Sequence, residues 1–192
     1  MREVILASRS KARQKCLRQV GIKFRVSASR VKEQHILKTT CSRLVIENAL
    51  SKARDVAKRY KKGIVVAADT VVLASGRIIG KPKSMNDARK TLKLLSRKPQ
   101  RVYTGIAVID IDRNKIFTDY EKTKIYMVKM TDSDISDYFK RTSPLDKAGS
   151  FDIQGRGAKF IKRIDGCFDN VVGLPITKLK KILKEINEET GR

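Results

Sequence analysis

The chain has 192 residues and 41% hydrophobic content, enough for one compact domain with a buried core or for two small lobes around a cleft. Its net charge of +24 makes nucleic acid, nucleotides, phosphorylated surfaces and anionic lipids candidate partners. The charge is spread along the chain and aromatic residues make up only 6%, which argues against a basic-tailed or base-stacking nucleic-acid binder. Adaptation to a hot habitat is another explanation of the charge.

Several protein classes are disfavoured by residues that the chain lacks. No apolar stretch approaches the roughly 20 residues of a membrane span, and the N-terminal apolar run is shorter than a signal-peptide core, so we expect a cytoplasmic protein. Cys16, Cys41 and Cys167 have no paired spacing, which suggests neither a disulfide framework nor structural zinc. The single histidine, His35, lacks an accompanying G-x-S-x-G turn, so we interpret it as a surface-loop residue.

The first half of the chain predicts strands and helices in turn. Apolar runs predict strands over residues 4–7 and 24–26, with a helix between them that ends at Gly21. A polar loop is expected over residues 29–42. It is followed by a helical stripe from Leu44 to Tyr60 and then by a β-branched strand over 64–73, the strongest strand signal in the chain.

The second half begins with a turn at Gly76 and a short returning strand at 78–79. Capping patterns predict helices starting near Ser84 and Thr131, and strands are expected over 102–111 and 116–128. Residues 144–175 are expected to be irregular, and a last helix follows Pro175. Because strands and helices do not alternate strictly, the pattern favours an α/β or α+β fold with a mixed sheet, in a single domain over 1–192.

Residues 8–13, Ser-Arg-Ser-Lys-Ala-Arg, lie between a predicted strand and a predicted helix. Hydroxyls, basic side chains and a helix N-terminus would converge there, which suits a phosphate. The absence of P-loop glycines excludes a Walker motif. Helix capping is the alternative role for Ser8 and Ser10.

Asp69 interrupts an almost wholly apolar strand. An acid in this position is costly to bury unless it is paired, hydrogen-bonded or bound to a metal. We therefore expect a break in the strand at a cleft, where Asp69 faces solvent and holds a divalent cation. A turn cap is the alternative.

Two further segments suit ligand binding. In Gly80-Lys81-Pro82 the lysine is either a positioned charge for a phosphate or one more surface lysine. The irregular stretch 144–157 has the length of a binding loop, and the amide of Gln154 within it can make two hydrogen bonds to a base edge.

Together these residues resemble the Maf family of nucleotide pyrophosphatases over nearly the whole chain. The matching motifs, in order, are Leu6-Ala7-Ser8-Arg9-Ser10-Lys11-Ala12-Arg13, Ala68-Asp69-Thr70, Gly80-Lys81-Pro82, Thr104-Gly105, Pro144 to Gly149, Ile153-Gln154-Gly155 and Val171 to Pro175. The resemblance implies a strongly bent mixed sheet, with two lobes around a cleft as in Maf and ITPase-like folds. It also implies hydrolysis of a nucleoside triphosphate to the monophosphate and pyrophosphate.

The resemblance assigns roles to individual residues. It makes Asp69 the general base and places Glu33 and Asp69 beside a divalent metal, Mg or Mn. Substrate-binding positions are Ser8, Ser10, Arg13, Lys52, Thr70, Lys81 and Gln154, of which Thr70 and Gln154 are linked to base selection. The family also makes a homodimer plausible.

The Asp-Thr and Ile-Gln-Gly motifs resemble the dTTP and UTP branch, and the 7-methyl-GTP branch differs at both positions. Ala12 replaces a family arginine tied to substrate choice, and Lys11 or Arg9 is a candidate to compensate for it. Two alternatives stay open: the same reaction on another base, and a non-enzymatic nucleic-acid-binding protein that uses the basic surface.

Overall fold

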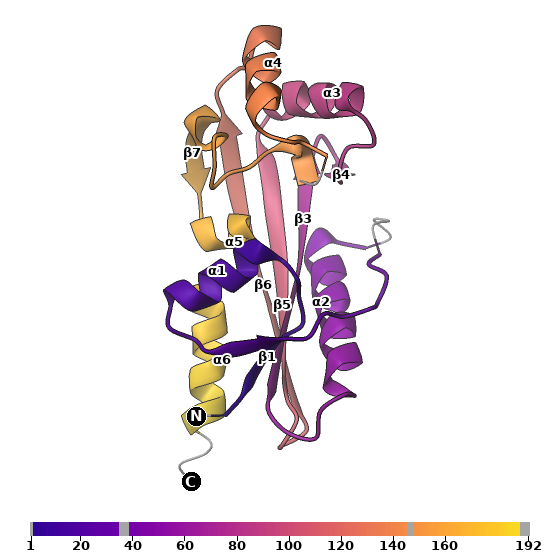
Figure 1. Cartoon of the computed structure of the whole chain (residues 1–192), viewed down its shortest axis with the longest axis vertical. Coiled ribbons are helices and arrows are strands. Elements are labelled where there is room, and N and C mark those ends of the chain that lie inside the picture. Colours follow the sequence, from indigo (N-terminus) through magenta and orange to yellow (C-terminus); the bar gives the residue numbers. More distant parts are fainter. Residues whose placement is uncertain (1, 35–38, 146–147, 189–192) are drawn as a thin grey trace.

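A computed structural model describes residues 2–34, 39–145 and 148–188 (Figure 1). His35, Asp146 and Lys147, which belong to segments discussed above, lie outside this part. The strands are β1 (Val4–Leu6), β2 (Phe24–Val26), β3 (Ile64–Ala74), β4 (Arg77–Ile79), β5 (Gln100–Asp110), β6 (Lys115–Met127) and β7 (Ile161–Asp165). The helices are α1 (Lys11–Gln19), α2 (Cys41–Ala57), α3 (Met85–Leu95), α4 (Asp132–Arg141), α5 (Phe168–Val172) and α6 (Ile176–Glu188).

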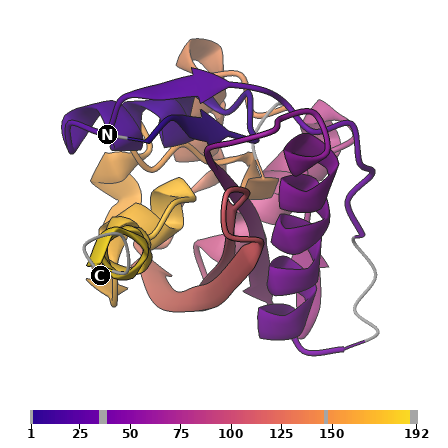
Figure 2. The ribbon, with the colours of Figure 1, turned by 90° about the horizontal axis from the view of Figure 1, so that it is seen from below.

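All seven strands form one mixed sheet, so the predicted fold class is confirmed. The order is β2-β1-β3-β5-β6-β7, with β4 paired to β3. β1 runs parallel to β2 and β3, and the other pairs are antiparallel. The long strands β3, β5 and β6 run the length of the molecule and bend, with α2 on one side and α1 and α6 on the other (Figures 1 and 2).

One edge of β3 has a gap in its strand pairing. β5 pairs with one edge of β3 over Ile64–Leu73, so β1 and β4 share the opposite edge. β1 pairs only with residues 64–66 and β4 only with residues 72–74. Among the described residues no strand therefore lies beside residues 67–71 of β3 on this edge, and Asp69 and Thr70 lie in the middle of the gap.

Two separate cores lie on the same face of the sheet. Val66 and Ala68 of β3 pack in a core with α1 and α6, whereas Val72 and Ala74 pack in a core with α3 and α4. Because side chains alternate along a strand, these residues share their face with Thr70, which falls between the two cores. This division produces the two lobes that the family resemblance implies.

The opposite face of the sheet is covered by α2, which packs very closely on β5. A Cβ atom added at Gly105 would lie 2.4 Å from the backbone carbonyl of Val45. Only glycine permits this approach. It brings the side chains of Asn48 and Lys52, one turn apart on α2, against β3.

Three sequence expectations need correction. β3 is continuous and Asp69 is buried, at 3% exposure, so the expected strand break is wrong. β5 pairs along it without interruption, and α2 supplies partners for the acid. Tyr60 lies beyond the end of α2. Residues 144–175 contain β7 and α5, each only five residues long and too short to show a periodic pattern.

Among the described residues no helix is long and apolar enough to cross a membrane.

Candidate active site

Asp69 is held by two side chains of α2. Nζ of Lys52 lies 2.7 Å from its Oδ1, and Nδ2 of Asn48 donates to its Oδ2 over 2.8 Å. Lys52 also donates to the backbone carbonyl of Ala68. A carboxylate is costly to bury without such partners. Both oxygens of Asp69 are thus fixed in direction.

Glu33, in the loop after β2, completes this cluster. Its Oε1 lies 2.6 Å from Nζ of Lys52, so one ammonium group contacts both carboxylates. The loop is positioned by Asn48, whose side chain exchanges two hydrogen bonds with the backbone of Gln34. The side chain of Glu33 is 40% exposed, whereas those of Lys52 and Asp69 are below 10%, so the cluster opens to solvent on the side of Glu33.

Thr70 faces the other side of the sheet, where Arg13 of α1 reaches it. The guanidinium donates to Oγ1 of Thr70 over 3.1 Å, to Oγ of Ser8 over 3.2 Å and to the carbonyl of Gly173 over 2.8 Å. Burial lowers the pKa of Arg13, while the negative charges of Asp69 and Glu33 oppose that shift. Arg13 is therefore a fixed positive charge at the gap in β3.

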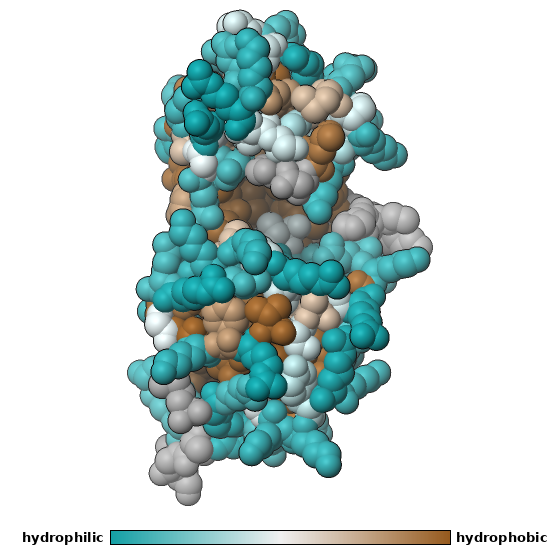
Figure 3. All heavy atoms as spheres, in the orientation of Figure 1, coloured by the Kyte–Doolittle hydropathy of each residue, from teal (hydrophilic) through white to brown (hydrophobic). Residues whose placement is uncertain are grey.

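Two cavities meet at Arg13. The larger, of about 710 Å³, lies between the two cores, and a smaller one of about 230 Å³ contains Glu33 and Lys52. Figure 3 shows a hollow at mid-height with an apolar floor and hydrophilic rims. Because Arg13 lines both cavities, the larger cavity adjoins the one that contains Glu33 and Lys52.

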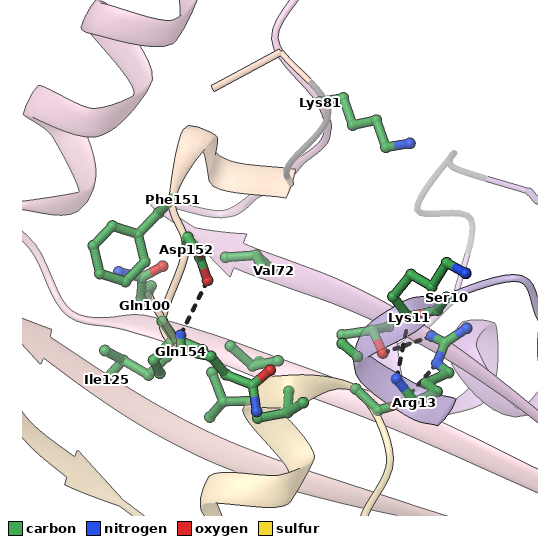
Figure 4. Close-up of a pocket in the computed structure, with 17 residues that line it drawn as sticks. Ser10, Lys11, Arg13, Val72, Lys81, Gln100, Ile125, Phe151, Asp152 and Gln154 are labelled. Carbon is green, nitrogen blue, oxygen red and sulfur yellow. Dashed lines mark hydrogen bonds between the residues drawn. The ribbon is translucent and has the colours of Figure 1, made fainter. Parts of the chain in front are cut away.

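The larger cavity has a cationic end and an apolar end (Figure 4). At the first, Lys11 and Arg13 extend from α1, and Lys81 extends from the opposite lobe. Ser10 caps α1 by accepting from the backbone N–H of Arg13. The apolar end is formed by Val72, Val102, Ile125, Phe151, Ile153, Val171 and Val172.

Gln154 enters the larger cavity on a tightly folded loop. The carboxylate of Asp152 accepts hydrogen bonds from the backbone N–H groups of Gln154 and Gly155, both over 3.1 Å. A Cβ at Gly155 would meet this carboxylate at 2.3 Å, and one at Gly157 would meet the backbone of Asp152 at 2.4 Å. The glycines therefore permit the fold that leaves the side chain of Gln154 exposed to the cavity.

The structure thus gathers the predicted site residues in two neighbouring groups. Ser10, Ala12, Thr70, Lys81 and Gln154 line the larger cavity. Ser8, Glu33 and Lys52 line the smaller one, with Asp69 directly behind Lys52. The two candidates for replacing the family arginine also separate, since Lys11 lines the larger cavity and Arg9 the smaller.

Some supporting residues were missed by the sequence reasoning. Asn48 holds Asp69. Oγ1 of Thr104 lies 3.0 Å from Oγ1 of Thr70 and donates to the carbonyl of Asn170, which ties β3 to α5. Gln100 is buried at the end of the larger cavity. The sequence gives only weak signals for them. Asn48 is an amide within a helical stripe and Gln100 is a polar residue at the start of a strand, and such residues also occur on protein surfaces.

The carboxylates fit a divalent cation. No group of three or more His, Cys, Asp or Glu side chains able to hold a metal occurs in the described ranges. Asp69 and Glu33 nevertheless converge on one cationic nitrogen. Two carboxylates match a hard cation such as Mg²⁺ or Mn²⁺, which commonly completes its coordination with water and substrate phosphates.

Comparison with known proteins gives consistent matches. The family model described as Maf-like protein matches residues 3–186. A dTTP/UTP pyrophosphatase of Methanosarcina barkeri is 44% identical over 186 residues, covering 96% of this chain and 94% of that protein. A dTTP/UTP pyrophosphatase of Bacillus anthracis is 41% identical and covers 97% of each chain. Among solved structures, the Ham1 protein of Staphylococcus aureus matches 66% of this chain and 72% of its own, with 16% identity and a TM-score of 0.47.

Proposed function

The chain belongs to the Maf family, and we propose that it hydrolyses dTTP and UTP to the monophosphate and pyrophosphate. One observation carries the proposal: a buried, hydrogen-bonded carboxylate, Asp69, lies at the gap in β3, beside a nucleotide-sized cavity that is cationic at one end and apolar at the other. The relatives named as dTTP/UTP pyrophosphatases support the choice of substrate.

The two ends of the larger cavity suggest how a nucleotide would bind. Arg13, Lys11 and Lys81 provide positive charge for a polyphosphate, which Arg can hold with two parallel hydrogen bonds. The apolar end suits a base, whose edges would meet the amide of Gln154. The phosphates would then lie near Arg13, the point from which the smaller cavity leads to Asp69.

In the proposed reaction a water oxygen bonds to the α-phosphorus while the bond to the oxygen bridging the α- and β-phosphorus breaks. Asp69 accepts the proton of this water, and pyrophosphate leaves. Lys52 and Asn48 fix both oxygens of Asp69, so the base needs no reorientation during the step. Arg13 and Lys81 neutralise charge on the polyphosphate. No covalent nucleophile is needed.

We propose Asp69 and Glu33 as the residues that hold a divalent cation, Mg²⁺ or Mn²⁺. The ion would supply charge neutralisation at the phosphates and a lowered pKa of bound water. Lys52 contacts both carboxylates, which keeps them from repelling each other.

Base preference follows from Thr70, Gln154 and position 12. Thr70 contacts Arg13 directly, so it links base selection to the phosphate end. Ala12 lines the larger cavity without a charge, and Lys11 beside it brings a cation to the same cavity. We therefore expect Lys11, rather than Arg9, to compensate for the missing family arginine.

The test is pyrophosphate release from dTTP, UTP, CTP, GTP, 7-methyl-GTP and ATP, with Mg²⁺, Mn²⁺ or EDTA. The Asp69→Asn variant keeps the shape of the side chain and removes its basicity. Asp119→Asn is the matched control, because Asp119 also pairs with a lysine, Lys178, but lies outside both cavities. We expect metal-dependent turnover of dTTP and UTP that is lost only in Asp69→Asn.

Hydrolysis of a nucleotide with a different base would support the proposed mechanism and assign a different substrate. A folded protein that hydrolyses none of the six would overturn the enzyme proposal. Salt-dependent binding of DNA or RNA, unchanged in Asp69→Asn, would then favour a nucleic-acid-binding role for the +24 charge. Light scattering tests the homodimer that the family makes plausible.

A further inference from the structure

The floor of the larger cavity is a patch of sheet whose register is known residue by residue. On β5, Gln100, Val102 and Thr104 are two residues apart and share one face. Thr104 pairs with Thr70 of β3, next to Arg13, whereas Gln100 pairs with Ile125 of β6. Four residues of extended strand separate Thr104 from Gln100, or about 14 Å. Gln100 thus marks the end of the floor farthest from the cationic groups.

Two hydroxyls in this stretch of sheet are fully buried and do not line the cavity. Thr104 bonds to Thr70 and to the carbonyl of Asn170, and Thr123 bonds to the backbone of Cys167 and to the amide of Asn170. These hydroxyls are engaged within the protein. They serve to hold α5 on the sheet and have little capacity left for a ligand.

Gln100 is the exception on the floor. Its side chain lines the cavity, the residue is only 4% exposed, and Nε2 donates to Sδ of Met127 over 3.1 Å. A thioether is a weak acceptor. In the described part of the chain no partner is found for Oε1 of Gln100. A carbonyl oxygen without a protein partner, on a side chain that lines a cavity, is available to a ligand.

The surroundings of Gln100 suit a flat ring. Val102, Ile125 and Phe151 line the same cavity as Gln100 (Figure 4). An apolar slot with one convergent polar group is a typical arrangement for recognising a base. The sulfur of Met127 engages the NH₂ group, which leaves the carbonyl oxygen of Gln100 as the free acceptor.

We propose that Gln100 is a further specificity-determining residue, whose Oε1 accepts a hydrogen bond from the N3–H of uracil or thymine. Cytosine carries a lone pair at N3 in place of this hydrogen, so it would oppose the carbonyl oxygen and lose the bond. Gln100 would then discriminate the two pyrimidine classes from the inner end of the cavity. Gln154, which is exposed, contacts the base from the other side. The proposal rests on the proposed function.

The test compares kcat/KM for UTP and for CTP in the wild type and in Gln100→Met. This substitution keeps the length of the side chain and removes the hydrogen-bond acceptor. We expect kcat/KM for UTP to fall about 10- to 100-fold and that for CTP to change little, because a site built around a hydrogen bond discriminates strongly. Asp119→Asn, which lies outside both cavities, is the control and should keep the preference for UTP. Thermal melting checks that both variants fold.

Binding of UMP and CMP, measured by calorimetry, provides a readout that does not need turnover. Tighter binding of UMP than CMP in wild type, lost in Gln100→Met, supports the proposal even if catalysis assigned above fails. An equal fall for both nucleotides would show a structural role and overturn it. The proposal would also be overturned if the wild type showed no preference between uracil and cytosine, or if Gln100→Met kept the preference for uracil. Absence of turnover with intact UMP selectivity would overturn only the proposed reaction.

Discussion

Asp69 and Thr70 are neighbours in the sequence, and their side chains lie on opposite faces of β3. Asp69 bonds to Asn48 and Lys52 of α2, while Thr70 bonds to Arg13 of α1. Neither β1 nor β4 covers this stretch of the edge of β3; Thr70 lines the larger cavity there, and Asp69 is buried behind Lys52 of the smaller one. One dipeptide therefore joins the acid cluster to the larger cavity, and substitutions around it should separate stability from activity.

Lys52→Met should destabilise the fold strongly. Lys52 contacts the carboxylate of Asp69 at 2.7 Å in a nearly dry environment, and its removal leaves a buried charge without a cation. Breaking such a pair costs about 3–5 kcal/mol. Urea unfolding at pH 7 measures the loss.

The double variant Lys52→Met/Asp69→Asn should lose much less than the sum of the two single changes, because the second substitution removes the stranded charge. Additive losses would show that the two side chains do not stabilise each other.

Gly105→Ala should loosen the contact between α2 and β5. The added Cβ would lie 2.4 Å from the backbone of Val45, which cannot be relieved by a rotamer change. We expect a loss of about 1–3 kcal/mol, together with reduced turnover as Asn48 and Lys52 move from Asp69.

Gly80→Ala is the matched control, since a Cβ there meets nothing within 4 Å. Chemical denaturation and pyrophosphate release on both variants make the comparison. Equal behaviour of the two would contradict the close packing of α2.

Arg13→Lys should reduce activity more than stability. An ammonium group cannot reproduce the planar arrangement that reaches Ser8, Thr70 and the carbonyl of Gly173 at once. We expect kcat/KM to fall about 10²- to 10³-fold, as for a lost donor to developing charge. Arg18→Lys, on the same helix but over the ring of Phe24, should remain close to wild type. Steady-state kinetics on both variants decide the matter.

Arg2→Met should make the free energy of unfolding less dependent on pH in the acidic range. The hydrogen bond from Arg2, together with the backbone N–H of Arg113, lowers the pKa of Asp110 against an opposing effect of burial. A lowered carboxyl pKa stabilises the fold above the unfolded value near 3.8, and this contribution disappears as pH falls through the folded value.

The variant should thus be less stable than wild type at pH 7, by about 1–3 kcal/mol, and the difference should shrink below about pH 4. Urea midpoints across this range test it. A difference independent of pH would exclude the ion pair as its cause.

The cysteines should differ in reactivity. Burial raises the pKa of the Cys16 and Cys41 thiols, whereas Cys167 is more exposed. Because the thiolate is the reactive form, a thiol reagent should modify Cys167 rapidly in the native protein and all three only after denaturation. Mass spectrometry identifies the modified residues; early labelling of Cys16 would contradict the packing of α1.

Much of the local structure could be predicted because its causes are local. The hydroxyls of Ser84 and Thr131 accept from the backbone N–H groups of Asp87 and Asp134, as their spacing predicts. The β-branched run over 64–73 is β3, and the stripe after Pro175 is α6. The order of short motifs also indicated the family.

The environment of the site was decided by tertiary structure. Asp69 stands out in the sequence as an acid in an apolar strand. The predicted strand break was wrong because the partners of Asp69, Asn48 and Lys52, come from another element, α2. The poorly satisfied amide of Gln100 is likewise evident only once β5, β6 and the loop at Phe151 enclose one cavity. Periodicity and capping are properties of consecutive residues, and sequence alone determines them. Burial, charge pairing and the gap along β3 depend on contacts between distant segments, which only the packed sheet brings together.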